Sequence, residues 1–164
     1  MPPAPSAFQL RRLTQAARQA AAASYSPYSK FPVGAAVLAD SGRIYAGCNV
    51  ENSSLGLCNC AERTAIFSAV AAGERRLDAV VVYTPTLTAT LPCGACRQVI
   101  NEFGPEALVI STYDGPASFA TDLPHLLPHA FSPSHLLTAS ALQPARRARK
   151  TRAKPASTPA PRRR

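Results

Sequence analysis

Cys60-Ala61-Glu62-Arg63 and Pro92-Cys93-Gly94-Ala95-Cys96 are the two stretches on which the interpretation of this sequence rests. Cys60, Cys93 and Cys96 offer three thiols, and Glu62 adds a carboxylate beside the first of them. Zinc sites that carry out chemistry commonly combine three protein ligands with a fourth position that is open to water. The two stretches therefore predict a catalytic Zn²⁺ site, with one ion per chain, in which Glu62 can reach the water without binding the metal.

Both stretches are predicted to open helices. Segment 60–72 is rich in Ala and stops at Gly73, and segment 93–103 is entered through a proline and left at Gly104. The free N–H groups and the positive end of a helix lower the pKa of thiols and stabilise thiolates. Three thiolates around one Zn²⁺ leave a net negative charge. Arg63 is predicted to offset that charge by donating a hydrogen bond to a cysteine sulfur.

A structural zinc site is the alternative that these residues leave open. A C-x-x-C motif alone is more often structural or redox-active than catalytic, and a closed site needs a fourth ligand. Cys58 stands close enough in the sequence to be that ligand. Otherwise Cys58 and Cys48 are expected to be small buried apolar residues.

The surrounding segments alternate between helix and strand patterns. An amphipathic helix is predicted over 8–23, a hairpin from strands 33–38 and 43–50, a central strand over 79–83, another strand over 107–111, and a last strand and short helix before Pro128. The alternation predicts an α/β fold, a three-layer α/β/α sandwich with a mixed, roughly five-stranded sheet.

The net charge of +9 comes entirely from the end of the chain. Residues 1–138 contain nine basic and nine acidic residues, and the other nine basic residues all lie beyond position 139. The sequence is therefore divided into a flexible N-terminus (1–7), a neutral catalytic domain (8–138) and a disordered basic tail rich in Pro, Ala and Arg (139–164).

Cysteine usage and hydropathy indicate the compartment. The cysteines number five, an odd count that fits an exported disulfide framework poorly, so we expect free thiols in a reducing cytoplasm. No stretch approaches the length of a membrane span, and no membrane partner is expected. The basic tail could instead direct nuclear import in a eukaryote.

The chain resembles the small, homotetrameric cytidine deaminases of pyrimidine salvage from Leu13 to Phe131. The resemblance rests on these blocks: Tyr25-Ser26-Pro27-Tyr28-Ser29-Lys30-Phe31-Pro32-Val33-Gly34-Ala35-Ala36, Gly47-Cys48-Asn49-Val50-Glu51-Asn52, Cys60-Ala61-Glu62-Arg63-Thr64-Ala65, Pro92-Cys93-Gly94-Ala95-Cys96-Arg97-Gln98-Val99, and Leu126-Leu127-Pro128 with Phe131. The two metal-site stretches match the three-cysteine form of the zinc deaminase signature, whose Glu moves protons without binding zinc. The resemblance implies a zinc-dependent hydrolase that converts cytidine and 2′-deoxycytidine to uridine and 2′-deoxyuridine and releases ammonia.

The resemblance also implies roles in substrate binding. Asn49 and Glu51 match a pair that hydrogen-bonds the ribose 3′-hydroxyl, and Phe31 matches an aromatic residue that lies against the pyrimidine ring, although core packing is the competing interpretation for Phe31. The main chain at Ala61 and Cys93 is implied to bind the edge of the base.

Contacts between subunits are implied at the C-terminal side of the domain. Phe131 matches a residue that reaches the site of a neighbouring subunit in a homotetramer. Three positions depart from the family pattern, namely Leu55, Cys58 and His125. These departures concern fine substrate preference and interface contacts rather than the reaction.

The sequence offers two further functions. Deamination of a polynucleotide is disfavoured because the first ligand is Cys rather than His, Trp is absent and the domain is neutral. A nucleic-acid-binding module is the non-enzymatic alternative, since the cationic tail would attract phosphates without sequence preference. That contact is possible but is not favoured over a solvated extension.

Overall fold

The computed structural model describes residues 4–136. The chain divides into a first unit, Met1–Ser132, and a second unit, Pro133–Arg164, and every element discussed below belongs to the first. The basic tail predicted for 139–164 lies outside the described residues, so the predicted domain boundaries stay a prediction. No helix within residues 4–136 combines the length and apolar character needed to cross a bilayer.

A five-stranded sheet forms the centre of the first unit. Its strands are β1 (Gly34–Ala39), β2 (Ile44–Cys48), β3 (Leu77–Thr84), β4 (Leu108–Tyr113) and β5 (Ser118–Asp122). They lie in the order β2-β1-β3-β4-β5, with β3 and β4 parallel and every other neighbouring pair antiparallel. The prediction of a mixed five-stranded sheet is confirmed.

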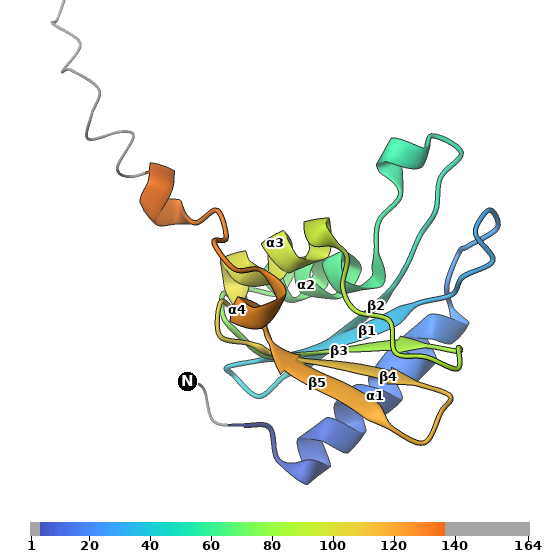
Figure 1. Cartoon of the computed structure of the whole chain (residues 1–164), viewed down its shortest axis with the longest axis horizontal. Coiled ribbons are helices and arrows are strands. Elements are labelled where there is room, and N and C mark those ends of the chain that lie inside the picture. Colours follow the sequence, from blue (N-terminus) through green and yellow to red (C-terminus); the bar gives the residue numbers. More distant parts are fainter. Residues whose placement is uncertain (1–3, 137–164) are drawn as a thin grey trace, which may run out of the picture. The chain divides into compact units, whose positions relative to one another are not determined.

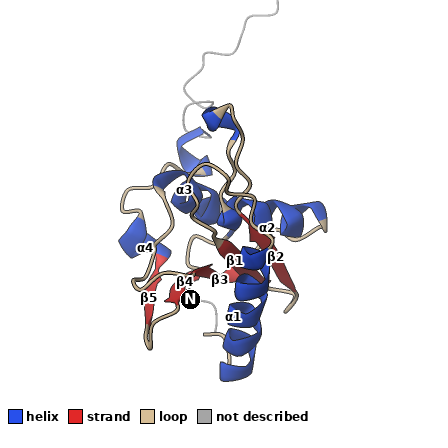
Figure 2. Cartoon of the chain, turned by 90° about the vertical axis from the view of Figure 1, so that its right-hand side faces the viewer, coloured by secondary structure: helices blue, strands red, loops and turns tan. Residues whose placement is uncertain are grey.

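Helices cover both faces of this sheet. They are α1 (Ala7–Ala22), α2 (Ala61–Ala71), α3 (Gly94–Phe103) and the short α4 (Leu123–Leu126), with a 3₁₀ turn, η1, at Leu55–Leu57. Figure 1 shows α1 on one face and α2 and α3 on the other, and Figure 2 shows the same layers after a quarter turn. This arrangement confirms the predicted three-layer α/β/α sandwich.

Alternation along the strands produces the two cores. Successive side chains of a strand point to opposite faces. On β1, Ala36 and Leu38 therefore pack with Leu13 and Ala17 of α1, while Val37 between them packs on the other side. The buried residues of α2 and α3 pack against that second face of the sheet. Each face of β1 is therefore covered by helices.

The element boundaries differ from the predictions by one to two residues at several places. Helix α1 begins one residue early because Ser6 caps it: Ser6 Oγ accepts from the Gln9 amide (3.2 Å) and Gln9 Oε1 accepts from the Ser6 amide (2.9 Å). Strand β3 extends past the predicted 79–83 at both ends, because β1 and β4 continue to pair with it there.

Gly47 sets how closely α2 approaches the sheet. A Cβ at this position of β2 would lie 2.5 Å from the Ala65 amide nitrogen and 2.8 Å from the Thr64 carbonyl carbon. These are backbone atoms of α2 and cannot move aside independently of the helix. The missing side chain therefore allows the helix that follows Cys60 to lie directly on β2.

Candidate metal centre and active site

The three predicted ligands meet at the beginnings of two helices. Cys60 is the N-cap residue of α2, Cys93 is the N-cap residue of α3, and Cys96 lies in the first turn of α3. Their sulfur atoms all lie within 4.8 Å of one another, and Cys60 Sγ is 3.9 Å from Cys93 Sγ. Two sulfurs bound at about 2.3 Å to a tetrahedral zinc ion lie about 3.8 Å apart. The spacing therefore fits a single Zn²⁺.

No other group of three or more His, Cys, Asp or Glu side chains in residues 4–136 is close enough to hold a metal ion. Cys58, the alternative fourth ligand, is not part of the group. Its sulfur is occupied by the main chain of Asn52, at 3.3 Å from the amide nitrogen and 3.6 Å from the carbonyl oxygen. The donor set within the described residues is thus three sulfurs, which leaves a tetrahedral ion one position for a non-protein ligand.

Arg63 supplies positive charge to the sulfur cluster. Its Nη2 lies 3.6 Å from Cys60 Sγ and also donates to the Cys58 carbonyl oxygen at 3.2 Å. A hydrogen bond from the Cys96 thiol and the Arg63 guanidinium together lower the pKa of Cys60 to about 5. Cys60 is therefore a thiolate at neutral pH before metal binds.

Cys96 behaves in the opposite way in the metal-free chain. Its hydrogen bond to Cys60 and its burial raise the pKa of Cys96. Zinc binds thiolates, so metal binding by these cysteines is accompanied by release of protons.

Glu62 is buried in the first turn of α2, with 4 % of its surface exposed. Its carboxylate is not among the cluster of metal-binding groups found within residues 4–136. Burial raises the pKa of Glu62, and the nearby Cys60 sulfur adds to the effect. A carboxyl group with a raised pKa beside a metal site can both accept and return a proton near neutral pH.

A cavity of about 370 Å³ opens onto this cluster. Its walls carry the predicted site residues Phe31, Asn49, Glu51, Cys60, Ala61, Glu62 and Cys93. The volume is in the range of small-molecule sites, and most of the lining is apolar with a few polar groups. The fold thus brings together residues from the segment before β1, the end of β2 and the starts of α2 and α3.

Asn49 is held in one orientation by its neighbours. Its Oδ1 accepts from Ser24 Oγ (2.5 Å) and from the Val33 amide (2.8 Å), and its Nδ2 donates to the Phe31 carbonyl oxygen (2.9 Å). An amide NH₂ carries two donors. One N–H of Asn49 therefore remains for a ligand in the cavity.

Glu51 organises the loop that precedes β1. Its Oε2 accepts from the amides of Tyr28 (2.9 Å) and Ser29 (3.2 Å). A hydrogen bond with the Ser29 side chain has the largest effect on the pKa of Glu51, and together with the two amide bonds it lowers that pKa. Glu51 is therefore ionised at neutral pH. Lys30 in this loop has a φ of 56°, an unusual value for a residue other than glycine.

Three predicted residues have differing exposure. Phe31 is 38 % exposed on the cavity wall, and Ala61 is fully buried at the first position of α2. Phe131 does not line the cavity and is 56 % exposed. Its carbonyl oxygen accepts from Gln98 Nε2 (2.8 Å) and Asn101 Nδ2 (3.4 Å) of α3.

The cavity is also lined by residues that the sequence did not indicate as site residues: Ser29, Val33, Val82, Thr90 and Leu91. Ser29 and Val33 lie in the segment 25–36, which matches the family pattern. The sequence could therefore have indicated that they lie near the site. Thr90 and Leu91 belong to the loop between β3 and α3, which has no periodic pattern to indicate which side chains point inward.

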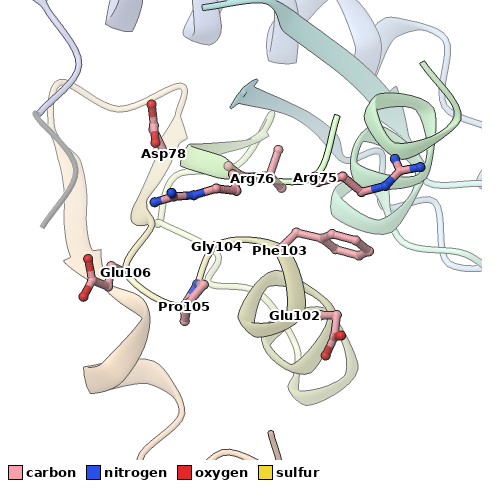
Figure 3. Close-up of a pocket in the computed structure, with 9 residues that line it drawn as sticks. Arg75, Arg76, Asp78, Glu102, Phe103, Gly104, Pro105 and Glu106 are labelled. Atoms are coloured by element: carbon pink, nitrogen blue, oxygen red, sulfur yellow. The ribbon is translucent and has the colours of Figure 1, made fainter. Parts of the chain in front are cut away.

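A second cavity, of about 350 Å³, lies beyond the other ends of α2 and α3 (Figure 3). It is lined by residues that follow these helices, including Arg75, Arg76 and Glu106. It contains no cysteine, and it is separated from the sulfur cluster by the length of the helices.

Comparison with known proteins identifies the class. The family described as "Cytidine and deoxycytidylate deaminase zinc-binding region" matches residues 8–112. The chain belongs to this family of zinc-dependent deaminases, and Cys60, Cys93 and Cys96 are positioned to bind a metal ion.

Individual relatives are similar over almost their whole length. The chain is 46 % identical over 131 residues to a cytidine deaminase of Sporosarcina psychrophila, a match that covers 79 % of this chain and 96 % of the relative. Its structure resembles crystal structures of cytidine deaminases from Burkholderia pseudomallei (48 % identity, TM-score 0.71, 74 % of this chain and 98 % of the other) and Mycobacterium tuberculosis (43 % identity, TM-score 0.65, 74 % and 96 %).

Proposed function

We propose that this chain catalyses the zinc-dependent hydrolytic deamination of cytidine and 2′-deoxycytidine to uridine and 2′-deoxyuridine, with release of ammonia. The observation that carries the proposal is a three-sulfur zinc cluster at the wall of a cavity of about 370 Å³, beside a buried carboxylate that is not a ligand. Membership of the deaminase family supports the same reaction.

The chemistry divides between the metal and Glu62. Bound zinc supplies a Lewis acid that activates a water molecule near neutral pH. Glu62 accepts a proton from the attacking water and delivers it to the ring nitrogen next to the reacting carbon. Glu62 then moves the proton of the added hydroxyl group to the leaving amine, so that water and cytidine become uridine and ammonia with the carboxylate restored. The raised pKa of Glu62 suits both directions of transfer.

The remaining site residues are assigned to substrate binding. Asn49 and Glu51 are proposed to hold the ribose 3′-hydroxyl, through the free N–H of the first and the carboxylate of the second. Phe31 is proposed to lie against the pyrimidine ring. The main-chain groups of Ala61 and Cys93 are proposed to bind the edge of the base, since the first N–H groups of a helix have no partner within the helix.

A homotetramer is proposed as the working form, with Phe131 contacting the site of a neighbouring subunit. Phe131 is 56 % exposed in the chain, so its ring is accessible to a neighbouring subunit. Light scattering by the purified protein measures the number of subunits. A cytoplasmic location is proposed as well, and the five cysteines, all free thiols, agree with it.

The Glu62→Gln variant tests the reaction. We expect about one zinc per chain to be retained, because the amide leaves the three sulfurs in place. Turnover of cytidine should fall by at least about 100-fold, because a positioned general acid–base residue contributes at least that much. Metal analysis and an ultraviolet assay on cytidine measure the two quantities.

Two results would contradict the proposal. One is zinc-loaded wild-type protein that does not convert cytidine. The other is a preference for cytosine in single-stranded DNA over the free nucleoside, which would assign the chain to polynucleotide deamination.

A further inference from the structure

Arg97 joins the segment that enters the zinc site to α4. Its Nε donates to the Pro92 carbonyl oxygen at 2.7 Å, and its Nη1 donates to the Leu126 carbonyl oxygen at 2.9 Å. Pro92 is fully buried and immediately precedes the ligand Cys93. One partly buried side chain therefore connects the start of α3 with the element that follows β5.

Arg97 holds both peptide groups on either side of Cys93. Its side chain binds the Pro92 carbonyl, and its amide donates to the Cys93 carbonyl at 3.0 Å. The φ and ψ angles of Cys93 are −68° and 168°. They set how the peptide plane before Cys93 and the peptide plane after it are turned about the two bonds to its Cα. Fixing both planes fixes the direction of the Cα–Cβ bond, and with it the region that the sulfur can reach.

We propose that Arg97 is a positioning residue for the zinc ligand Cys93. The inference rests on the zinc site of the proposed function, but it concerns a residue that lies outside the sulfur cluster and is not among the residues that line the cavity. The forked guanidinium suits the task because it offers two donors at a fixed angle to two different carbonyls. A lysine ammonium on a flexible stem can replace one of these bonds at most.

The same helix face links the site to the end of the first unit. Gln98 and Asn101 donate to the Phe131 carbonyl oxygen, while Arg97 holds Leu126. Side chains of α3 thus fix the segment from α4 to Phe131 against the helix that supplies two of the three sulfurs. A displacement of that segment would be transmitted to Cys93 through Arg97.

Two variants, Arg97→Met and Arg97→Lys, test the inference in the full-length zinc protein. Methionine keeps much of the apolar stem and loses the two side-chain hydrogen bonds, to the carbonyls of Pro92 and Leu126. Lysine keeps the charge and can form one of these two bonds. We expect Arg97→Met to release zinc to a colorimetric chelator at least about tenfold faster than wild type, as for other groups that orient metal ligands. Arg97→Lys should lie between the two.

A spectroscopic measurement separates positioning from general loss of stability. With cobalt(II) in place of zinc, the sulfur-to-metal charge-transfer bands report the arrangement of the thiolates. We expect these bands to shift in Arg97→Met. Because Cys93 also lines the cavity, we expect kcat on cytidine to fall and KM to rise in the same variant.

Arg75→Met is the matched control. Arg75 also donates to two carbonyl oxygens, those of Val70 (2.9 Å) and Glu74 (2.7 Å), but it lines the second cavity (Figure 3). Helix α2 has eleven residues and is about 16 Å long, and Arg75 follows its C-terminal end. This variant should lower the melting temperature while zinc release and the cobalt spectrum stay as in wild type.

The outcomes distinguish the two proposals. Wild-type rates of zinc release and an unchanged cobalt spectrum in Arg97→Met would overturn the role of Arg97, as would equal effects of Arg97→Met and Arg75→Met. If Arg97→Met does not fold, Arg97→Lys with a wild-type release rate has the same meaning. A wild-type protein that binds zinc without deaminating cytidine would refute the proposed reaction and leave the zinc-release test of Arg97 intact.

Discussion

Asn49 shows how a single side chain is prepared for a ligand. Three hydrogen bonds determine which end of its amide is oxygen and which is nitrogen, and the shortest, at 2.5 Å, comes from Ser24 just after α1. The amide cannot rotate without breaking these bonds. A ligand that needs the remaining N–H therefore loses little conformational entropy from this residue.

Ser24→Ala is expected to weaken substrate binding through Asn49, which is proposed to bind the ribose. Loss of one hydrogen bond of about 1 kcal/mol corresponds to roughly a fivefold increase in KM for cytidine, with kcat nearly unchanged. Steady-state kinetics measure both. Ser26→Ala is the control, because Ser26 contacts Ser24 and not Asn49. Equal effects of the two variants would contradict this role of Ser24.

The sequence was sufficient to predict the three sulfurs that the fold brings together, but not the residues that orient their neighbours. Cys93 and Cys96 are one helical turn apart, so their proximity follows from local geometry. Ser24 reaches Asn49 only because the isolated bridge between Tyr25 and Val50 brings two distant segments together. Nothing in the pattern of residues around Ser24 indicates that pairing.

Glu74 ties the β1–β2 hairpin to the connection between α2 and β3. It is 5 % exposed, and its Oε1 accepts from Ser41 Oγ (2.8 Å), Arg43 Nε (2.7 Å) and Tyr45 Oη (3.1 Å). These three residues lie in the hairpin turn and the adjoining part of β2. The hydrogen bonds, led by that of Ser41, lower the pKa of Glu74.

This arrangement makes the contribution of Glu74 to stability depend on pH. The pKa in the folded chain lies below its ordinary value of 4.5, so the stabilisation is complete at neutral pH. This stabilisation is lost as the pH falls below about 4.5 and then through the pKa of Glu74 in the folded chain. We expect Glu74→Gln to be less stable than wild type at neutral pH, with a difference that shrinks in acid, measured as urea midpoints.

The control for this prediction is Glu102→Gln, an exposed position on α3. Its effect should be small at every pH. A difference between wild type and Glu74→Gln that stays constant from neutral to acidic pH would contradict the role of the ionised carboxylate.

At the level of elements, the type of each was predictable and the boundaries were not. The continuous apolar run in β3 and the Gly stops after α2 and α3 are local signals, and each lies where the sequence predicts it. The reciprocal cap between Ser6 and Gln9 does have a local signature, Ser-x-x-Gln at the start of α1. The added pairs at the ends of β3 depend on the neighbouring strands β1 and β4, and no pattern within β3 indicates them.

A zinc ion bound by these sulfurs would connect the N-terminal ends of two helices, α2 and α3. Cys60 precedes α2 and Cys93 precedes α3, so an ion bound to both closes a long loop through the sheet. A ligand that binds only the folded state stabilises it in proportion to the logarithm of its concentration over its dissociation constant.

Removal of zinc is therefore expected to lower the melting temperature by on the order of 10 °C, for a site filled far above its dissociation constant. Circular dichroism during heating, with and without a chelator, measures the change. Added Zn²⁺ should restore the original value and added Mg²⁺ should not, because thiolates favour zinc. An identical transition in the metal-free protein would show that the ion contributes nothing to the fold.

The contact at Gly47 has a consequence for how the protein can vary over time. Where backbone meets backbone, no exchange of neighbouring side chains can make room for a larger residue, so compensating changes elsewhere offer no route around the constraint. Gly56 and Gly94 have open space around the position of a Cβ and are free to drift. Glycine at position 47 should therefore stay fixed in any lineage that keeps α2 where it can present Cys60.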